Sequence, residues 1–169
     1  KALADTPEVI LLDEPFSNID TFRKNKLRRN LYGYLKAKNI TCITATHDSD
    51  EALSFADTIL MLREGKKEMM GPPQEIINNI VTPYQAGFFG SGSHVNMSLF
   101  DGHKKEHFKT LLPHQLKISE TKTPLSGFVS KHYFKGHFYE LEIQTPTETL
   151  FVNHPKKIAH NAVVFVTLV

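Results

Sequence analysis

The chain has 169 residues, of which 40% are hydrophobic and 22% are charged, and these proportions exclude disordered, collagen-like and coiled-coil proteins. Its net charge of +2 is too small to indicate a nucleic-acid-binding protein by itself. The single cysteine, Cys42, excludes an internal disulfide framework and a cysteine-based zinc site.

The first half of the chain alternates short apolar runs with helical patterns. Residues 9–12 form a continuous apolar run that ends at Asp13-Glu14-Pro15, which predicts a strand buried on both faces. Asp20 can cap a helix over residues 21–38, and the Thr- and Ile-rich residues 40–46 predict a second strand. A short helix is expected at residues 49–56. Two strands joined by a turn are expected at residues 59–62 and 66–70, and a last helix at residues 71–80. Strands separated by helices imply a mostly parallel, layered α/β unit.

The second half has a different character. Residues 90–95 begin Gly90-Ser91-Gly92-Ser93 and are expected to form a flexible connector. After it the strands come closer together, and Lys135-Gly136 suggests a hairpin between two of them. The expected strands are residues 116–119, 127–134, 137–144, 149–152 and 163–169. We therefore predict an α/β domain over residues 1–89 and a small all-β domain, shaped as a barrel with few strands, over residues 96–169.

Two adjacent carboxylates carry the strongest chemical signal. Asp13 and Glu14 come directly after a buried strand, at the end where ligands bind in open α/β sheets. Side-by-side carboxylates are costly unless a cation is near, and Mg²⁺ on a nucleotide is the usual partner. The simpler interpretation is a strand that ends in an acidic turn.

Further motifs follow in a fixed order: Ser17-Asn18-Ile19-Asp20, then Thr46-His47-Asp48, then Gly71-Pro72-Pro73-Gln74-Glu75-Ile76 and Phe88-Phe89-Gly90. In this order and spacing the first half resembles the second half of an ABC-transporter ATPase subunit of the importer type, a P-loop-type nucleotide-binding domain. Asp13-Glu14 resembles the end of the Walker B motif, residues 17–20 the D-loop and His47 the switch histidine. Residues 1–4 resemble the helix tail just after the family's signature motif. The second half resembles the OB-like TOBE domain, on the residues Leu112-Pro113-His114-Gln115, Gly127-Phe128-Val129 and Tyr133-Phe134-Lys135-Gly136.

The resemblance implies a role for each of these polar residues. Asp13 would hold Mg²⁺ through water, Glu14 would accept the proton of the attacking water, and His47 would stabilise charge on the γ-phosphate of ATP. Ser17 and Asp20 would contribute to the nucleotide site and couple it to the second site across an ATPase dimer. The resemblance also implies membrane-spanning permease subunits as partners and a cytoplasmic location at the inner face of the cell membrane. The implied solute is a sugar, a polyamine, ferric iron or an oxyanion.

Two motifs of that family do not occur in the sequence. There is no Gly-x-x-x-x-Gly-Lys-Ser/Thr loop to hold phosphates with backbone N–H groups, and no Leu-Ser-Gly-Gly-Gln signature. We interpret the chain as the C-terminal part of a longer subunit that does not hydrolyse ATP by itself. The strand at residues 40–46 would then have a bare apolar edge, so self-association is expected.

A binding module of a different class is the alternative. Residues 131–139 interleave basic and aromatic side chains, as OB-like modules for single-stranded nucleic acid do, and a small solute is a second candidate ligand. Alternation in a β-hairpin explains the same residues. The predicted first helix also carries a basic cluster: Arg23, Lys24, Lys26, Arg28 and Arg29. Because Phe22, Leu27 and Leu31 form its apolar stripe, we expect that cluster to be a solvated face without nucleic acid.

Overall fold

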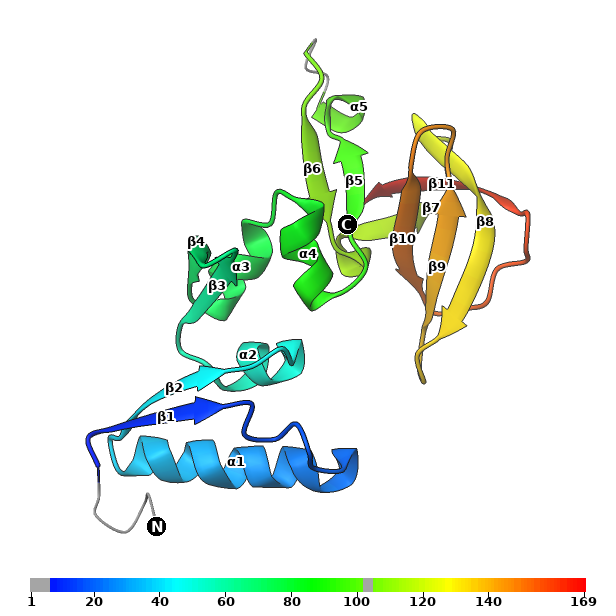
Figure 1. Cartoon of the computed structure of the whole chain (residues 1–169). Coiled ribbons are helices and arrows are strands. Elements are labelled where there is room, and N and C mark those ends of the chain that lie inside the picture. The colour runs from blue at the N-terminus through cyan, green and yellow to red at the C-terminus, as the bar shows by residue number, and fades with distance from the viewer. Residues whose placement is uncertain (1–6, 102–104) are drawn as a thin grey trace. The chain divides into compact units, whose positions relative to one another are not determined.

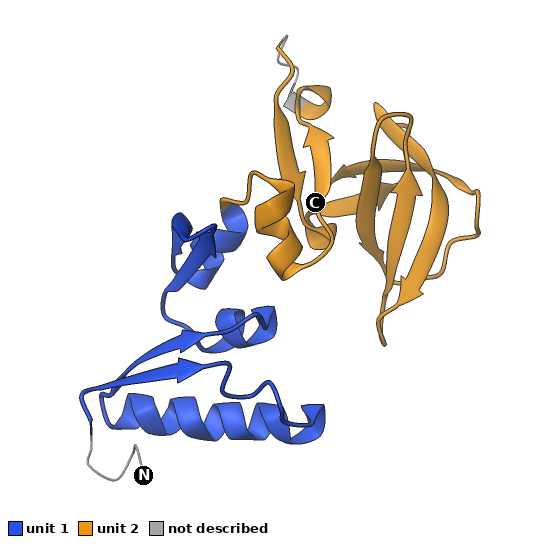
Figure 2. Ribbon diagram, in the orientation of Figure 1, with its two compact units in different colours: residues 1–78 blue, residues 79–169 orange. Residues whose placement is uncertain are grey.

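The computed structural model describes residues 7–101 and 105–169, and the chain divides into two compact units, residues 1–78 and 79–169 (Figures 1 and 2). The helix tail expected at residues 1–4 lies outside the described residues. The connector expected at residues 90–95 lies inside the second unit, and its Ser93 is fully buried at the start of a strand. Within the described ranges, no helix combines the length and the apolar character that crossing a bilayer requires.

The first unit begins with a strand–helix–strand arrangement (Figure 1). Strands β1 (Val9–Asp13) and β2 (Thr41–Ala45) are parallel, and the helix α1 (Thr21–Ala37) connects them. Asp20 caps α1 by accepting a hydrogen bond from the backbone N–H of Arg23 at 3.0 Å, as its position predicts. The core of this unit joins Ile10, Leu35 and Ile40, with Leu12, Leu31, Tyr32 and Cys42 packed against them.

Among the described residues, cover is found on one face of the β1–β2 pair. Ile10 is buried, but Leu11 and Ile43, which face each other in the ladder, are 73% and 60% exposed. The expectation that residues 9–12 are buried on both faces is therefore wrong, because α1 packs on one side of a two-stranded sheet. The predicted apolar stripe of α1 is also wrong in part, since Phe22 is 92% exposed.

The rest of the first unit consists of α2 (Ser49–Phe55), the strands β3 (Ile59–Arg63) and β4 (Lys66–Gly71), and α3 (Pro73–Asn78). The two strands form an antiparallel hairpin. Its turn uses Glu64 and Gly65, both with positive φ, which is the backbone that a tight two-residue turn needs. The elements are those predicted from the sequence, but among the described residues the parallel sheet is limited to β1 and β2.

The second unit opens with elements that the sequence pattern did not indicate. Helix α4 (Pro83–Phe89) starts with a capping box between Thr82 and Gln85. It precedes an antiparallel pair made by β5 (Ser93–Asn96) and β6 (Phe108–Leu111), with the short helix α5 (Ser98–Asp101) between them.

A five-stranded antiparallel sheet forms the bulk of the second unit, with the order β10-β9-β8-β11-β7. It follows the 3₁₀ turn η1 (Pro113–Gln115). Its strands are β7 (Leu116–Ser119), β8 (Leu125–Phe134), β9 (Tyr139–Gln144), β10 (Thr149–His154) and β11 (Val163–Leu168). All five lie close to the positions predicted from the sequence.

The sheet is curled but not closed. Its two edge strands, β7 and β10, contact each other, yet the hydrogen-bonded order of the described strands ends at both of them. The backbone N–H of Phe151 on β10 instead donates to the hydroxyl of Ser93 at 2.8 Å. The barrel expected from the sequence is therefore an open sheet here, because β5 takes a hydrogen bond from the edge that closure would use.

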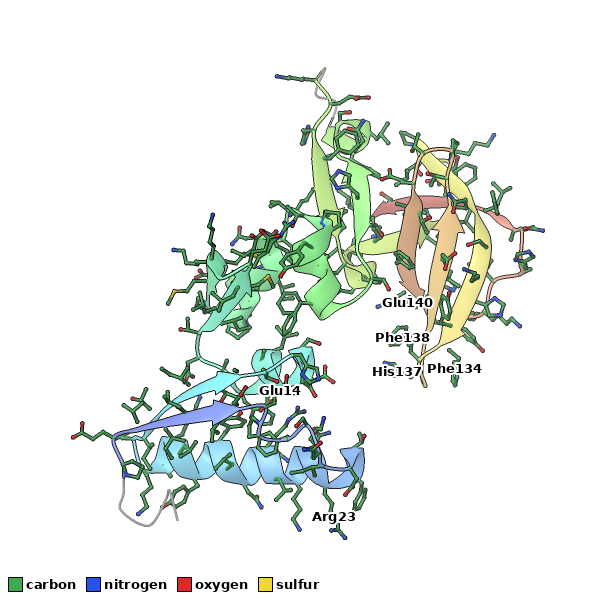
Figure 3. The ribbon with its side chains drawn as sticks, viewed as in Figure 1. Glu14, Arg23, Phe134, His137, Phe138 and Glu140 are labelled. Atoms are coloured by element: carbon green, nitrogen blue, oxygen red, sulfur yellow. The ribbon has the colours of Figure 1, made fainter. Side chains whose placement is uncertain are left out.

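The β8–β9 hairpin contains the interleaved basic and aromatic residues. Lys135 donates its backbone N–H to Phe138 at 2.9 Å, and Gly136 adopts a φ of 95°, so the predicted hairpin turn is confirmed. Phe134, His137 and Phe138 lie near its tip (Figure 3). The Phe134 ring packs 5.1 Å from the ring of Tyr139 across the strands. Cross-strand packing thus accounts for this aromatic contact without a bound base.

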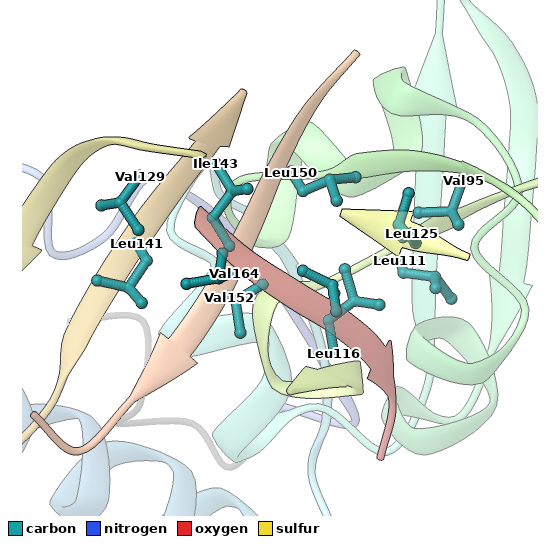
Figure 4. Packing of buried hydrophobic residues seen from close by; sticks show 11 residues of the cluster. Val95, Leu111, Leu116, Leu125, Val129, Leu141, Ile143, Leu150, Val152 and Val164 are labelled. Atoms are coloured by element: carbon teal, nitrogen blue, oxygen red, sulfur yellow. The ribbon is translucent and has the colours of Figure 1, made fainter. Parts of the chain in front are cut away.

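An apolar core stabilises the second unit (Figure 4). Its eleven buried members are Val95, Leu111, Leu116, Leu125, Val129, Leu141, Ile143, Leu150, Val152, Val164 and Val166. Val95 on β5 and Leu111 on β6 belong to it, so the small hairpin packs on the larger sheet. Along β9 and β10, the residues of this core alternate with residues of the opposite face.

Candidate functional site

The carboxyl ends of β1 and β2 bring the two predicted catalytic residues together. Asp13 lies opposite Ala45 in the parallel ladder, so Glu14 lies one residue and His47 two residues beyond the last pair. The Glu14 Oε1 atom lies 2.8 Å from the Nδ1 atom of His47. Both side chains are exposed, and Figure 3 shows Glu14 at the end of β1. A carboxylate and an imidazole in contact at an open sheet end are groups that can accept and donate protons.

The backbone at Glu14 has an unusual conformation. Its φ is 42°, in the left-handed region that non-glycine residues seldom occupy. Three hydrogen bonds hold it there: its N–H donates to Ala45 O at 2.9 Å, and its carbonyl accepts from the N–H of Ser17 at 3.2 Å and from the Ser17 hydroxyl at 3.0 Å. The tight turn directs the Glu14 side chain toward His47. Such backbone strain is concentrated at functional sites in proteins.

Ser17 and Asp20 occupy structural positions beside this turn. Ser17 fixes the carbonyl of Glu14, as described above, and Asp20 caps α1. One Asp20 oxygen also lies 3.8 Å from the Nε atom of Arg23, with both side chains largely exposed. Neither role uses all the acceptor capacity of these side chains.

Asp13 is an exposed carboxylate at the end of β1. Mg²⁺ in nucleotide sites is bound by one or two carboxylates, and phosphate oxygens and water complete its coordination. In residues 7–101 and 105–169 there is no group of three or more His, Cys, Asp or Glu side chains that could hold a metal ion. A single exposed carboxylate at a strand end fits Mg²⁺ that arrives with a nucleotide.

A buried polar cluster lies behind His47, and the sequence did not predict it. The Arg28 side chain is only 3% exposed, and its Nη2 atom lies 2.6 Å from Asp48 Oδ2 and 3.2 Å from Glu51 Oε2. Glu51 also accepts hydrogen bonds from Tyr32 at 2.5 Å and from Thr46 at 2.8 Å. The expectation that Arg28 belongs to a solvated face is wrong, because it lies on the α1 face that carries Leu35. The spacing of Arg28, Tyr32 and Leu35 could have indicated this.

The charged groups in this cluster shift one another's pKa values. The hydrogen bond from Arg28 lowers the pKa of Asp48 to about 2. Burial opposes the charge of Arg28, but the hydrogen bond to Asp48 and the charge of Glu51 outweigh it and raise the pKa of Arg28. Burial, together with the hydrogen bond to Glu51, raises the pKa of Tyr32 well above its usual value. Both shifts favour the charged forms of Arg28 and Asp48, so this ion pair persists at neutral pH.

Known proteins resemble the chain over most of its length. It is 31% identical to the spermidine/putrescine import ATP-binding protein PotA of Bacillus thuringiensis (strain Al Hakam), over 92% of this chain and 44% of the relative. It is 32% identical to the sulfate/thiosulfate import ATP-binding protein CysA of Halalkalibacterium halodurans, over 83% of this chain and 38% of the relative. This chain belongs to the family of ABC import ATP-binding proteins. The resemblance that begins at Asp13-Glu14 is thereby confirmed.

The chain spans less than half the length of these import ATP-binding relatives. No protein-family model matches it. Among solved structures, CbiO1 from Clostridium perfringens, part of the ABC transporter complex CbiONQ, is 32% identical with a TM-score of 0.40, over 43% of this chain and 29% of CbiO1.

Proposed function

We propose that this chain supplies the Walker B, D-loop and switch-histidine part of an ATP-hydrolysing subunit that drives solute import. The observation that carries this proposal is the 2.8 Å contact between Glu14 and His47, at the ends of two parallel strands. It occurs in a chain whose relatives are named import ATP-binding proteins. A sheet end of this kind is where nucleotide-binding α/β proteins hold their ligands.

The proposed chemistry assigns one task to each side chain. Asp13 would hold Mg²⁺, which would supply positive charge to offset that of the ATP phosphates. Glu14 accepts a proton from the attacking water while that water forms a bond to the γ-phosphorus and the bond to the bridging oxygen breaks. His47 donates a hydrogen bond to the γ-phosphate and stabilises the charge that develops there. Ser17 and Asp20 couple this site to the second site of an ATPase dimer.

The proposed partners are a second ATPase subunit and the membrane-spanning permease subunits, which places the complete protein in the cytoplasm at the inner face of the cell membrane. We propose a TOBE-like role for residues 96–169. The relatives' names include a cationic polyamine and the anions sulfate and thiosulfate. The proposed solute class therefore remains a sugar, a polyamine, ferric iron or an oxyanion.

Replacing Glu14 in the complete protein tests the proposal. Glu14→Gln keeps the size of the side chain but removes its ability to accept a proton. We expect ATP hydrolysis to slow by at least ~10²-fold, the scale of a lost general base, while ATP binding persists. Steady-state turnover and nucleotide binding are measured on the same preparation.

Glu8→Gln is the matched control, because Glu8 is exposed just before the other end of β1. That variant should hydrolyse ATP at the wild-type rate. Near-normal turnover in Glu14→Gln would remove Glu14 from the catalytic role and with it the proposed function.

A further inference from the structure

The loop that carries His47 is held on both sides by one cluster. Before His47, the Thr46 hydroxyl donates to Glu51 Oε2 at 2.8 Å and accepts from the backbone N–H of Asp48 at 3.1 Å. After His47, Asp48 Oδ1 accepts from the backbone N–H of Glu51 at 3.1 Å, which also caps α2. Glu51 therefore fixes both neighbours of His47.

Arg28 links this loop to α1. Its Nη2 atom contacts the carboxylates of Asp48 and Glu51 together, and Lys24 Nζ lies 3.4 Å from Asp48 Oδ2. The cluster thus balances two cations against two anions. Because Arg28 and Glu51 are almost fully buried, removing one charge leaves its partner buried and unpaired. The cluster is expected to respond as a unit.

The same guanidinium also contacts the turn that carries Glu14. Arg28 lies over the ring of Phe16, with 5.6 Å between its Cζ atom and the ring centroid. Phe16 is buried two residues after Glu14, and its ring packs edge-on against Tyr32 with centroids 6.1 Å apart. Tyr32 in turn donates to Glu51. One side chain on α1 therefore contacts both loops that end at the Glu14–His47 pair.

We propose that Arg28 is a positioning residue that sets the geometry of the Glu14–His47 pair through Asp48, Glu51 and Phe16. The inference rests on the proposed function of that pair. Arg28 itself lies behind the loops and touches neither Glu14 nor His47 in any contact that the structure records among its described residues. Its effect on the reaction is indirect, because a misplaced catalytic pair loses the alignment on which proton transfer depends.

The geometric part of the inference can be tested on this chain by NMR. The ring-nitrogen shifts of His47 report its hydrogen bond, and Glu14→Gln gives the reference shift for a lost carboxylate partner. We expect Arg28→Gln to move the His47 shifts toward that reference, with the backbone shifts of β1 and β2 retained. Arg28→Lys keeps the charge and should give a smaller change. Arg29→Gln, the same substitution at the exposed neighbour, should leave His47 unchanged.

A variant that fails to fold does not end the test. Asp48→Asn removes the ionic partner of Arg28 while keeping a residue that caps helices well, so α2 retains its N-terminus. The same displacement of the His47 shifts is expected in that variant. Wild-type His47 shifts in folded Arg28→Gln or folded Asp48→Asn would overturn the inference.

Kinetics on the complete protein separate this inference from the proposed function. We expect Arg28→Gln to lower kcat by roughly 10- to 10²-fold with the KM for ATP unchanged, the scale of a displaced reacting group. Combined with Glu14→Gln, it should cause little further loss, because both changes affect one unit. If Glu14→Gln is inactive and Arg28→Gln has the wild-type kcat, the positioning role of Arg28 is refuted while the proposed function stands. If Glu14→Gln retains normal turnover, the proposed function fails.

Discussion

Glu14 could be predicted from the sequence because it follows an apolar run that ends in two carboxylates, whereas His47 was indicated by the resemblance of the motifs to those of ABC ATPases; both residues follow a strand. Two such strand ends in a parallel pair meet at one edge, and the 2.8 Å contact follows from that topology. Arg28 could not be assigned in the same way. It is one of six basic residues on α1 that are alike in charge, and only the packing of α2 against α1 brings Asp48 and Glu51 to Arg28 and not to Arg29.

The Asp48 carboxylate provides a prediction about acid stability. Its hydrogen bond from Arg28 lowers its pKa from 3.8 to about 2 in the folded chain. The stabilisation is therefore complete above the unfolded pKa and is lost as the pH falls through about 2. A shift of this size corresponds to about 2 kcal/mol. Asp48→Asn should accordingly destabilise α2 and the His47 loop at pH 6 by this order, and by much less near pH 2.

Hydrogen exchange of the α2 amides, measured at both pH values, checks this prediction. Asp57→Asn is the control, since Asp57 pairs with Lys36 on the surface with its side chain 82% exposed. Exposed ion pairs contribute about 0–1 kcal/mol, so that variant should change little. A destabilisation by Asp48→Asn that is the same at pH 6 and pH 2 would rule out the ionic role of Asp48.

At the scale of elements, the sequence predicts the positions of most strands from their local residue pattern. It does not predict burial or pairing that depends on elements distant in the chain. Strands β9, β10 and β11 of the large sheet alternate buried with less buried residues, and they lie close to the positions predicted from the sequence. Strands β5 and β6 were missed: β5 begins at Ser93, inside a Gly- and Ser-rich segment, and its pairing with β6 depends on a partner 12 or more residues away in the chain. The continuous apolar run in β1 predicts burial on both faces, and this prediction is wrong because Leu11 is exposed. An apolar run shows that the side chains of a strand can be buried on both faces. Whether they are buried depends on which other elements pack against each face.

The close approach of β8 to β9 depends on the absence of a side chain at Gly127. A Cβ atom at this position would lie 2.5 Å from the carbonyl oxygen of Gln144 and 2.8 Å from Ile143 Cγ2. The first of these atoms belongs to the backbone of β9, so the strands would have to separate. Gly127→Ala should therefore destabilise the second unit by roughly 1–3 kcal/mol, the usual cost of overpacking.

Urea unfolding followed through the amides of β8 and β9 measures this effect. The control is Gly87→Ala in α4 of the same unit, where a Cβ atom would meet nothing within 4 Å. Because alanine favours helix over glycine, that variant should be more stable by roughly 0.5–1 kcal/mol. Equal stability of the two variants would contradict the close approach of β8 and β9.

At the scale of the whole molecule, the nucleotide-binding capacity of this chain can be predicted from its sequence motifs. Phosphate groups are held mainly by backbone N–H groups of a glycine-rich loop and the helix that follows it. The sequence contains no such loop. We expect this 169-residue chain to bind Mg·ATP weakly or not at all and to show no hydrolysis. Equilibrium dialysis measures the binding, and saturable low-micromolar affinity would show that another phosphate cradle exists.

The uncovered face of the β1–β2 pair leads to a prediction about association. Leu11 and Ile43 lie side by side and exposed on this face, and within the described residues β2 pairs with β1 alone. An apolar face next to an unpaired strand edge is a template for pairing with another chain. We therefore expect copies of this chain to self-associate through β2 and this face, and size-exclusion chromatography with light scattering measures the resulting mass.

Charged residues on this face should reverse the association. Leu11→Lys combined with Ile43→Lys places two cations on the proposed interface, so their repulsion and hydration should shift the chain toward monomer. Val163→Lys is the control, because Val163 is equally exposed, at 72%, but lies on β11 of the second unit. That variant should retain the wild-type mass. A wild-type chain that is a monomer and still protects its amides along β2 from hydrogen exchange would show that the edge needs no partner.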